Sequence, residues 1–329
     1  MSTNAKETSE EPMPANDVAP LVDGATKLAV GFVGLGVMGW PMAANIALAG
    51  FPVFVHNRTR ERADEFARSS DGVTVCASPA EVAAFADVIL TMLADGRAVD
   101  DVYLGDMGLL AGAKPGAVFV DMSTIGPEHA AALGARVEEA GFELVDAPVS
   151  GSVATAKSAT LLVMAGGSED AVARVRPVLQ AMGSMMHVGP SGSGATMKLA
   201  VNTVVYGLNQ SLSEALVLAE RSGLDRRLTY EVFANSAVGA PFVHYRRAAF
   251  ERPGEGPVAF RAELASRDLR LILELGAKVG ADLRQAETNL EVLDQAVDAG
   301  FGNSDVSAVA SFLRDKNPVP PSGIPERGG

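Results

Sequence analysis

LAVGFVGLGVMGWPMAANIALAGFPVFVHN, residues 28–57, is the stretch that decides the fold. It contains no Asp, Glu, Lys or Arg, so a hydropathy window reads it as a possible membrane span. Five glycines and two prolines divide it into a strand-like run, a helix-like run over 41–48 and a second strand-like run. Because a buried parallel strand is apolar on both faces, a strand–helix–strand unit of a doubly wound sheet produces such a stretch without lipid. We therefore expect an α/β fold and no membrane partner.

A glycine-rich loop follows the first expected strand and opens the helix. It matches the GxGxxG pattern with the residues Gly34, Leu35, Gly36, Val37, Met38 and Gly39. In this context the first glycine permits a tight turn, the second lets a pyrophosphate approach the backbone, and the third lets helix and strand pack closely. Free N–H groups at the start of the helix then hold the anion. A tight turn that binds no ligand is the alternative, which the strand–loop–helix–strand context disfavours.

The residues after the second strand bear on which dinucleotide binds. NAD sites carry an Asp or Glu about 20 residues beyond the loop, where it holds the ribose hydroxyls. Here the strand ends in Asn57, Arg58, Thr59 and Arg60, without a carboxylate. The guanidinium of Arg58 suits a 2′-phosphate, and Arg60 adds a second positive charge. NADP is therefore favoured and NAD stays possible; in the alternative, Thr59 caps the next helix and both arginines are solvated.

Short apolar runs then alternate with helix-like segments as far as about residue 191. This alternation predicts a largely parallel sheet covered by helices, whose ligands lie beyond the carboxyl ends of the strands. Six residues directly follow three of these strands: Leu93, Ala94, Ser123, Thr124, Ser150 and Gly151. We expect them at one rim of the sheet, although each taken alone is an ordinary loop residue.

The chain divides into five parts: a disordered tail 1–27, a dinucleotide-binding domain 28–191, an interdomain helix 192–224, a helical C-terminal domain 225–316 and a disordered tail 317–329. Four polar residues share one stripe of the interdomain helix: Lys198, Asn202, Asn209 and Ser213. Periodicity alone fits a solvated stripe as well as a catalytic one. The position between two domains favours catalysis.

Residues 239–258, GAPFVHYRRAAFERPGEGPV, are expected to be a linker beside the site. Phe242, His244 and Tyr245 are candidates for the wall that faces the substrate. For each of the three, packing in a core or interface is the more ordinary role.

Composition excludes several classes of function. The net charge of −13 argues against nucleic-acid and anionic-membrane partners, because both need a basic surface. Cys76 is the single cysteine, so no intramolecular disulfide and no Cys-rich zinc site can form. The four histidines are scattered, without metal-ligand spacing, and we expect no metal. A reducing, cytoplasmic location is the natural expectation.

Several blocks of the chain resemble the β-hydroxyacid dehydrogenase family, which includes 3-hydroxyisobutyrate dehydrogenases, tartronate semialdehyde reductases and glyoxylate/succinic semialdehyde reductases. The blocks are GFVGLGVMGWPMAANI (31–46), DMST (121–124), DAPVSG (146–151) and GATMKLAVN (194–202), and ASRDL (265–269) is similar to a fifth, the family's KDL block. The resemblance covers about residues 28–315 in the expected order. It implies a Rossmann-type N-terminal domain and an all-α C-terminal domain.

The resemblance also implies roles for individual residues. Lys198 would be the catalytic acid/base, and Asn202 would help to position it and the substrate. Substrate contacts would come from Ser123, Ser150, Gly151 and Ser152, and cofactor contacts from Leu93, Ala94 and Thr124. Arg267 stands where the family has a lysine that reaches the cofactor, which keeps the charge and changes the geometry. Three further departures replace residues that are often glycine: Ser152, Thr155 and Ala159.

The expected function is therefore NADP-dependent interconversion of a short β-hydroxy acid and its semialdehyde or keto acid, with Lys198 as acid/base. An imine reductase is the closest rival enzyme; it typically has Asp or Tyr in place of the lysine. A non-catalytic module that binds nucleotide or assembles oligomers is a rival of another class. The expected partners are a small-molecule substrate and a second copy of the chain, as a homodimer or homotetramer.

Overall fold

The computed structural model describes residues 28–316; the tails expected at 1–27 and 317–329 lie outside the described residues. The charge-free stretch folds as strand β1 (Val30–Val33), helix α1 (Gly39–Leu48) and strand β2 (Val53–His56). β1 is buried along its whole length and pairs in parallel with β2, with Val30 opposite Val53. Within the described residues, no helix has the length and apolarity that crossing a bilayer requires.

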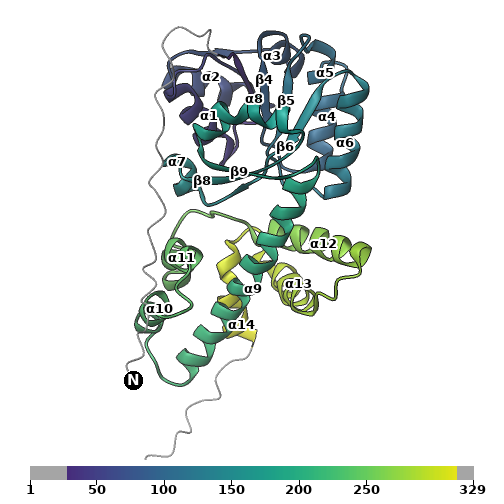
Figure 1. Ribbon diagram of the computed structural model, residues 1–329. Coiled ribbons are helices and arrows are strands. Elements are labelled where there is room, and N and C mark those ends of the chain that lie inside the picture. Colours follow the sequence, from purple (N-terminus) through teal and green to yellow (C-terminus); the bar gives the residue numbers. More distant parts are fainter. Residues whose placement is uncertain (1–27, 317–329) are drawn as a thin grey trace, which may run out of the picture.

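A largely parallel sheet forms the first domain, as expected; β8 pairs antiparallel with β6 and β7 (Figure 1). The further strands are β3 (Val73–Val75), β4 (Val88–Thr91), β5 (Val118–Asp121), β6 (Glu143–Asp146), β7 (Val149–Ser150), β8 (Leu161–Gly166) and β9 (Gly183–Gly189). Their order is β3-β2-β1-β4-β5-β6-β8-β7, with β9 on β8, and strands β1 to β6 are parallel. The order reverses between β1 and β4, so the carboxyl ends of these two strands flank a crevice where ligands of such sheets bind.

Helices cover both faces of the sheet. They are α1, α2 (Arg60–Ser69), α3 (Pro79–Phe85), α4 (Gly96–Leu104), α5 (Leu109–Gly112), α6 (Pro127–Glu139), α7 (Val153–Lys157) and α8 (Glu169–Gln180). Successive residues of β4 enter different cores: Val88 and Leu90 pack with α1, α2 and α8, whereas Ile89 packs with α3, α4 and α6. This two-sided burial is the reason that the strands read as continuous apolar runs.

A single long helix, α9 (Ser193–Arg221), leads from the sheet domain into a helical domain (Figure 1). α10 (Arg226–Ala234) and α11 (Pro241–Glu251) lie on one side of it, and α12 (Ala262–Val279) and α13 (Arg284–Ala296) lie on the other. A π-helical turn η1 (Val297–Phe301), a 3-10 turn η2 (Val306–Ala308) and α14 (Val309–Lys316) complete the domain.

The prediction of a linker over 239–258 is wrong for its first half, which forms helix α11. Pro241 occupies its first turn, where the missing N–H costs nothing, and Phe242, Val243 and Phe250 are buried. The following turn-rich stretch, RPGEGPV at 252–258, does connect α11 to α12.

Candidate active site

The three glycines of the loop after β1 have different surroundings. Gly34 has φ +101°, and a Cβ there would overlap the Met92 carbonyl oxygen; a Cβ on Gly39 would overlap the carbonyl oxygen of Gly34. A Cβ on Gly36 would meet nothing within 4 Å. The N–H groups of Gly36, Val37 and Met38 have no acceptor among the described residues. An open cradle of free N–H groups at the start of α1 fits the pyrophosphate of a dinucleotide.

Asn57, at the end of β2, holds this loop. Its side-chain oxygen accepts from the Leu35 N–H at 3.0 Å, and its amide donates to the Thr59 carbonyl at 2.9 Å. Arg62 also binds the loop, through the carbonyls of Leu35 and Gly36. We did not single out Arg62 from the sequence, and no sequence signal separates it from its neighbours.

Of the two arginines directly after β2, one is paired within residues 28–316 and the other is not. Arg60 pairs with Asp64 at 2.9 Å within α2. Thr59 stands at the N-cap position of α2, but its hydroxyl makes no capping hydrogen bond. Arg58 is exposed and has no hydrogen-bond or ion-pair partner in the part of the chain that the structure describes.

The residues after β4 and β5 meet at the same rim, as expected. The Leu93 N–H donates to the Ser123 hydroxyl at 2.9 Å, and that hydroxyl donates to Asp121 at 2.7 Å. Ser123 is therefore buried and turned into the sheet, whereas the neighbouring Thr124 is half-buried and lines two cavities. The Ala94 carbonyl accepts from Arg267 of α12, which joins the rim to the helical domain.

Lys198 lies in the second turn of α9, and its Nζ donates to the Val149 carbonyl at 2.8 Å. Asp146 fixes the start of that helix by accepting from the N–H groups of Gly192 and Ala195, both at 2.7 Å. Burial lowers the pKa of the Lys198 ammonium below its ordinary value of 10.5, and the carboxylate of Asp268 opposes this shift. A lysine with this pKa exchanges protons more readily near neutral pH than an exposed one.

Asp268 connects the polar residues around Lys198. One of its oxygens accepts from Tyr206 at 2.8 Å and from Asn202 at 3.1 Å; the other accepts from Arg267 at 2.8 Å. Burial, with Asp268 beside it, raises the pKa of the Tyr206 phenol well above 10, which keeps it protonated as a donor. Asp268 and Tyr206 were not among the residues that we singled out, although Asp268 stands within the ASRDL block.

The polar stripe of α9 is buried, which excludes the solvated alternative. Asn202, Asn209 and Ser213 are all less than a tenth exposed. Asn209 donates to the Val306 carbonyl at 3.2 Å, and the Ser213 hydroxyl donates to the Asn209 carbonyl. The stripe therefore has two parts: Lys198 and Asn202 at the cavity between the domains, and Ser213 in the packing of the helical domain, with Asn209 at the boundary.

A cavity of about 150 Å³ lies between the two domains and collects much of the expected site. Its lining includes Met38, Thr124, Ser150, Gly151, Ser152, Lys198 and Asn202. Phe242 and Tyr245 form part of its wall, whereas His244 is exposed and lies outside it. Leu93, Ala94, Ser123 and Arg267 do not line it; they lie around the adjoining rim. The cavity thus brings Lys198 close to Met38 of the glycine loop.

Comparison with known proteins agrees with this arrangement. Residues 29–189 match the NAD-binding domain of 6-phosphogluconate dehydrogenase, and residues 192–313 match the NAD-binding domain of NADP-dependent 3-hydroxyisobutyrate dehydrogenase. The chain is 33% identical to 2-(hydroxymethyl)glutarate dehydrogenase of Eubacterium barkeri, over 89% of this chain and 97% of that protein. The chain belongs to the β-hydroxyacid dehydrogenase family.

Two further members of the β-hydroxyacid dehydrogenase family illustrate the likeness. Glyoxylate/succinic semialdehyde reductase 2 of Arabidopsis thaliana is 32% identical, over 87% of this chain and 80% of that protein. The structure of 3-hydroxyisobutyrate dehydrogenase from Mycobacterium tuberculosis with L-serine has a TM-score of 0.75 at 33% identity, and it covers 88% of this chain and 100% of that one. The chain is accordingly an oxidoreductase of the hydroxyacid dehydrogenase and semialdehyde reductase kind, with a nicotinamide cofactor.

Two of the departures from the family pattern form one local structure. Ser152 caps α7 by accepting from the Thr155 N–H at 3.3 Å, and the Thr155 hydroxyl accepts from the Ser152 N–H at 2.6 Å. This capping box occupies the Ser152 N–H, so that group is not free for a ligand. Ala159 has φ +54°, a left-handed conformation that glycine adopts without strain.

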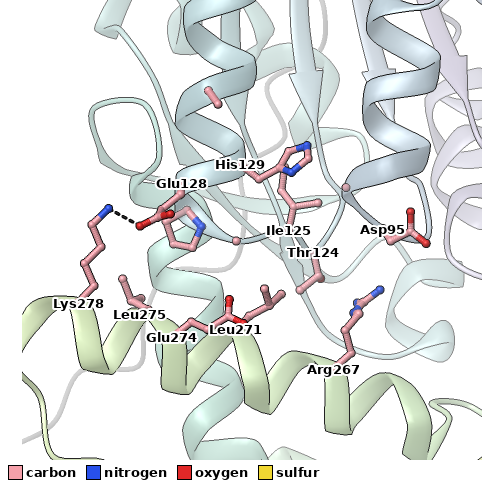
Figure 2. A pocket seen from close by; sticks show the side chains of 14 residues that line it. Asp95, Thr124, Ile125, Glu128, His129, Arg267, Leu271, Glu274, Leu275 and Lys278 are labelled. Atoms are coloured by element: carbon pink, nitrogen blue, oxygen red, sulfur yellow. Dashed lines mark hydrogen bonds and ion pairs between the residues drawn. The ribbon is translucent and has the colours of Figure 1, made fainter.

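A second cavity, of about 780 Å³, opens beside the first and shares Thr124 with it. Figure 2 shows Arg267 reaching from α12 toward Asp95 and Thr124 at one end, and Lys278 paired with Glu128 at the other. It lies beyond the carboxyl ends of β4 and β5, next to the rim. No cluster of three or more His, Cys, Asp or Glu in residues 28–316 is arranged to hold a metal ion.

Proposed function

We propose that this chain interconverts a short β-hydroxy acid and its semialdehyde with NADP as cofactor and Lys198 as acid/base. The observation that carries the proposal is the buried Lys198 ammonium in the small interdomain cavity, beside Asn202 and the strand ends that follow the glycine loop. The names of relatives support the reaction class, since they include both a hydroxy-acid dehydrogenase and a semialdehyde reductase.

When bound, the nicotinamide supplies or accepts the hydride. In reduction, the Lys198 ammonium donates its proton to the alkoxide oxygen that forms as the carbonyl carbon gains hydride. In oxidation, the neutral Lys198 amine takes the hydroxyl proton as the carbon loses hydride. Asp268 favours the ammonium form, and burial favours the amine, so both forms are accessible to one side chain.

Ser150 and Gly151 are the groups to which we assign the substrate carboxylate. Both line the cavity with Lys198. The Ser150 hydroxyl and the Gly151 N–H have no hydrogen-bond partner among the described residues, whereas the Ser152 N–H and the Ser123 hydroxyl are already engaged. Because Ser123 is buried, we infer that it acts by holding the Leu93 backbone at the rim.

We infer that Arg58 reads the 2′-phosphate of NADP, since Arg60 is already paired with Asp64. Arg58→Ala is expected to raise the KM for NADPH about tenfold or more while leaving the KM for NADH unchanged. Arg68→Ala, at an exposed arginine in the last turn of α2, is the control. Equal effects of Arg58→Ala on both cofactors would argue against the assignment.

A substrate panel tests the reaction class. NADPH and NADH oxidation are followed with short semialdehydes, glyoxylate and cyclic imines. Turnover of semialdehydes supports the proposal, and preferred turnover of imines indicates the imine reductase, against which the lysine at 198 argues. Tight NADPH binding with no turnover of any compound would indicate a binding module.

We further propose that the protein is cytoplasmic and forms a homodimer or homotetramer. Exposed large apolar side chains on α9 and α10, among them Val204, Leu218 and Leu228, support self-association, because burial against a partner removes apolar surface from water. Light scattering of the purified protein measures the number of copies.

A further inference from the structure

Arg246 is a buried cation in the wall of the small cavity, and nothing in the proposed chemistry uses it. It lies on α11, is 7% exposed, and lines both this cavity and a neighbouring one of about 660 Å³. Its Nη1 donates to Asp305 at 2.7 Å. Its Nε is buried without an acceptor, and its Nη2 has no hydrogen bond in the described part of the chain.

The arrangement around Arg246 leaves one edge of the guanidinium unused. Nε and Nη2 form the side-on fork that matches the two oxygens of a carboxylate. The guanidinium carbon lies 5.7 Å from the Phe242 ring centre and 5.9 Å from that of Tyr245, within the range of a cation–π interaction. A buried, unpaired N–H of a charged group costs free energy unless a ligand satisfies it.

Asp305 is not a partner of Arg246 alone. The carboxylate also accepts from the N–H groups of Ala259 at 3.0 Å and Phe260 at 3.2 Å, and from the N–H and hydroxyl of Ser307 at 3.1 and 2.9 Å. It therefore anchors the 259–260 and 305–307 segments by itself and positions Arg246 from one side. The opposite edge of Arg246, with its Nε and Nη2, has no acceptor in the described part of the chain, so no protein group competes with an anion for it.

We propose that Arg246 is a specificity-determining residue that binds a second carboxylate of the substrate, remote from the reacting carbon. The inference rests on the proposed function: Lys198 takes the reacting oxygen, Ser150 and Gly151 the first carboxylate, and Arg246 the second. The substrate class is then a β-hydroxy acid, or its semialdehyde, that carries a carboxylate-bearing side arm. A purely structural ion pair between α11 and η2 is the competing explanation.

A set of matched substrates separates the two explanations. The probes are 3-hydroxypropanoate with three different 2-substituents: methyl, 2-carboxyethyl, and the neutral 2-carbamoylethyl amide of the same shape. With wild-type protein and NADP, kcat/KM for the dicarboxylate is expected to exceed that for the amide by about tenfold or more, mainly through KM. Equal values for acid and amide would overturn the proposal, and this comparison needs no variant.

Two variants then identify the residue. Arg246→Lys keeps a charge beside Asp305 and loses the fork; Arg246→Gln loses both. Each is expected to lose about tenfold or more on the dicarboxylate and to stay within about twofold of wild type on the methyl and amide compounds. Equal losses on all three compounds would show a structural role and refute the proposal.

A binding measurement distinguishes failure of this inference from failure of the proposed function. The dicarboxylate is titrated calorimetrically into protein saturated with NADPH, where no turnover occurs. Binding that is about tenfold weaker in Arg246→Lys supports the assignment even if the reaction class is wrong. Turnover of the methyl compound together with unchanged dicarboxylate binding in Arg246→Lys refutes the inference and leaves the reaction class intact.

Discussion

Lys198→Met removes the ammonium group from the interdomain cavity and keeps most of the side chain's length. General acid–base catalysis contributes typically about 10²- to 10⁴-fold. We therefore expect kcat/KM to fall by that factor, which corresponds to about 3 to 5 kcal/mol of transition-state stabilisation. The variant loses the hydrogen bond to the Val149 carbonyl, worth about 1 kcal/mol, and no longer buries a charge, so unfolding free energy should change little.

The pH dependence of the rate gives the sharper readout. In wild-type protein, reduction requires the ammonium, so its rate falls as pH rises through the pKa of Lys198, which burial places below 10.5. Oxidation requires the amine, so its rate rises over the same interval. The pH–rate profiles of reduction and oxidation thus each have one such limb. Both limbs should be absent from the profiles of Lys198→Met, measured by stopped-flow NADPH absorbance. Lys157→Met, at an exposed lysine of α7, is the control and should behave as wild type. If Lys198→Met kept near-normal turnover with both limbs intact, another group would be the acid/base.

Two further predictions concern the surroundings of Lys198 and the glycine loop. Asp268→Asn removes the carboxylate that raises the pKa of Lys198, so both limbs should move to lower pH; a shift to higher pH, or none, would contradict the assigned electrostatics. Gly39→Ala places a methyl group against the Gly34 carbonyl oxygen and should lower the unfolding free energy by about 1–3 kcal/mol in chemical denaturation. The methyl group of Gly36→Ala contacts no protein atom, so this variant should keep the unfolding free energy of the wild type. Its affinity for NADPH should be at least about tenfold lower by fluorescence titration. Similar losses of stability in both glycine variants would show that Gly36 is structural.

Most of the fold could be predicted because its signals are local. Apolar runs buried on both faces, glycine punctuation and the long helix from Ser193 are each visible within a short window, and the structure places each as expected. The segment 241–251 failed because its signals conflict: Pro241 and the arginines resemble a connecting loop, whereas Phe242, Val243 and Phe250 become apolar helix contacts only when the cores of the second domain are assembled.

The site is less predictable, because its contacts join residues that are distant in the chain. Lys198 and the rim residues were proposed from motifs, and the structure brings Lys198 and Thr124 to one cavity. Asp268 pairs with Asn202 across 66 positions, and Arg246 meets Asp305 across 59, so no window of sequence contains either pair. The orientation of Ser123 was missed too: its acceptor Asp121 is only two positions away, but the Leu93 N–H that donates to its hydroxyl comes 30 positions earlier.

Helix α9, about 43 Å long, connects the two domains that together line the site. Asp146 fastens its first turn to the sheet domain, so Lys198 keeps its place relative to the dinucleotide cradle. The wall that carries Arg246 belongs to α11, which packs against α10 and η2. Substitutions in α11 are therefore expected to alter the cavity wall while Lys198 stays in place, so that related proteins can differ in substrate range without a change in the position of this lysine.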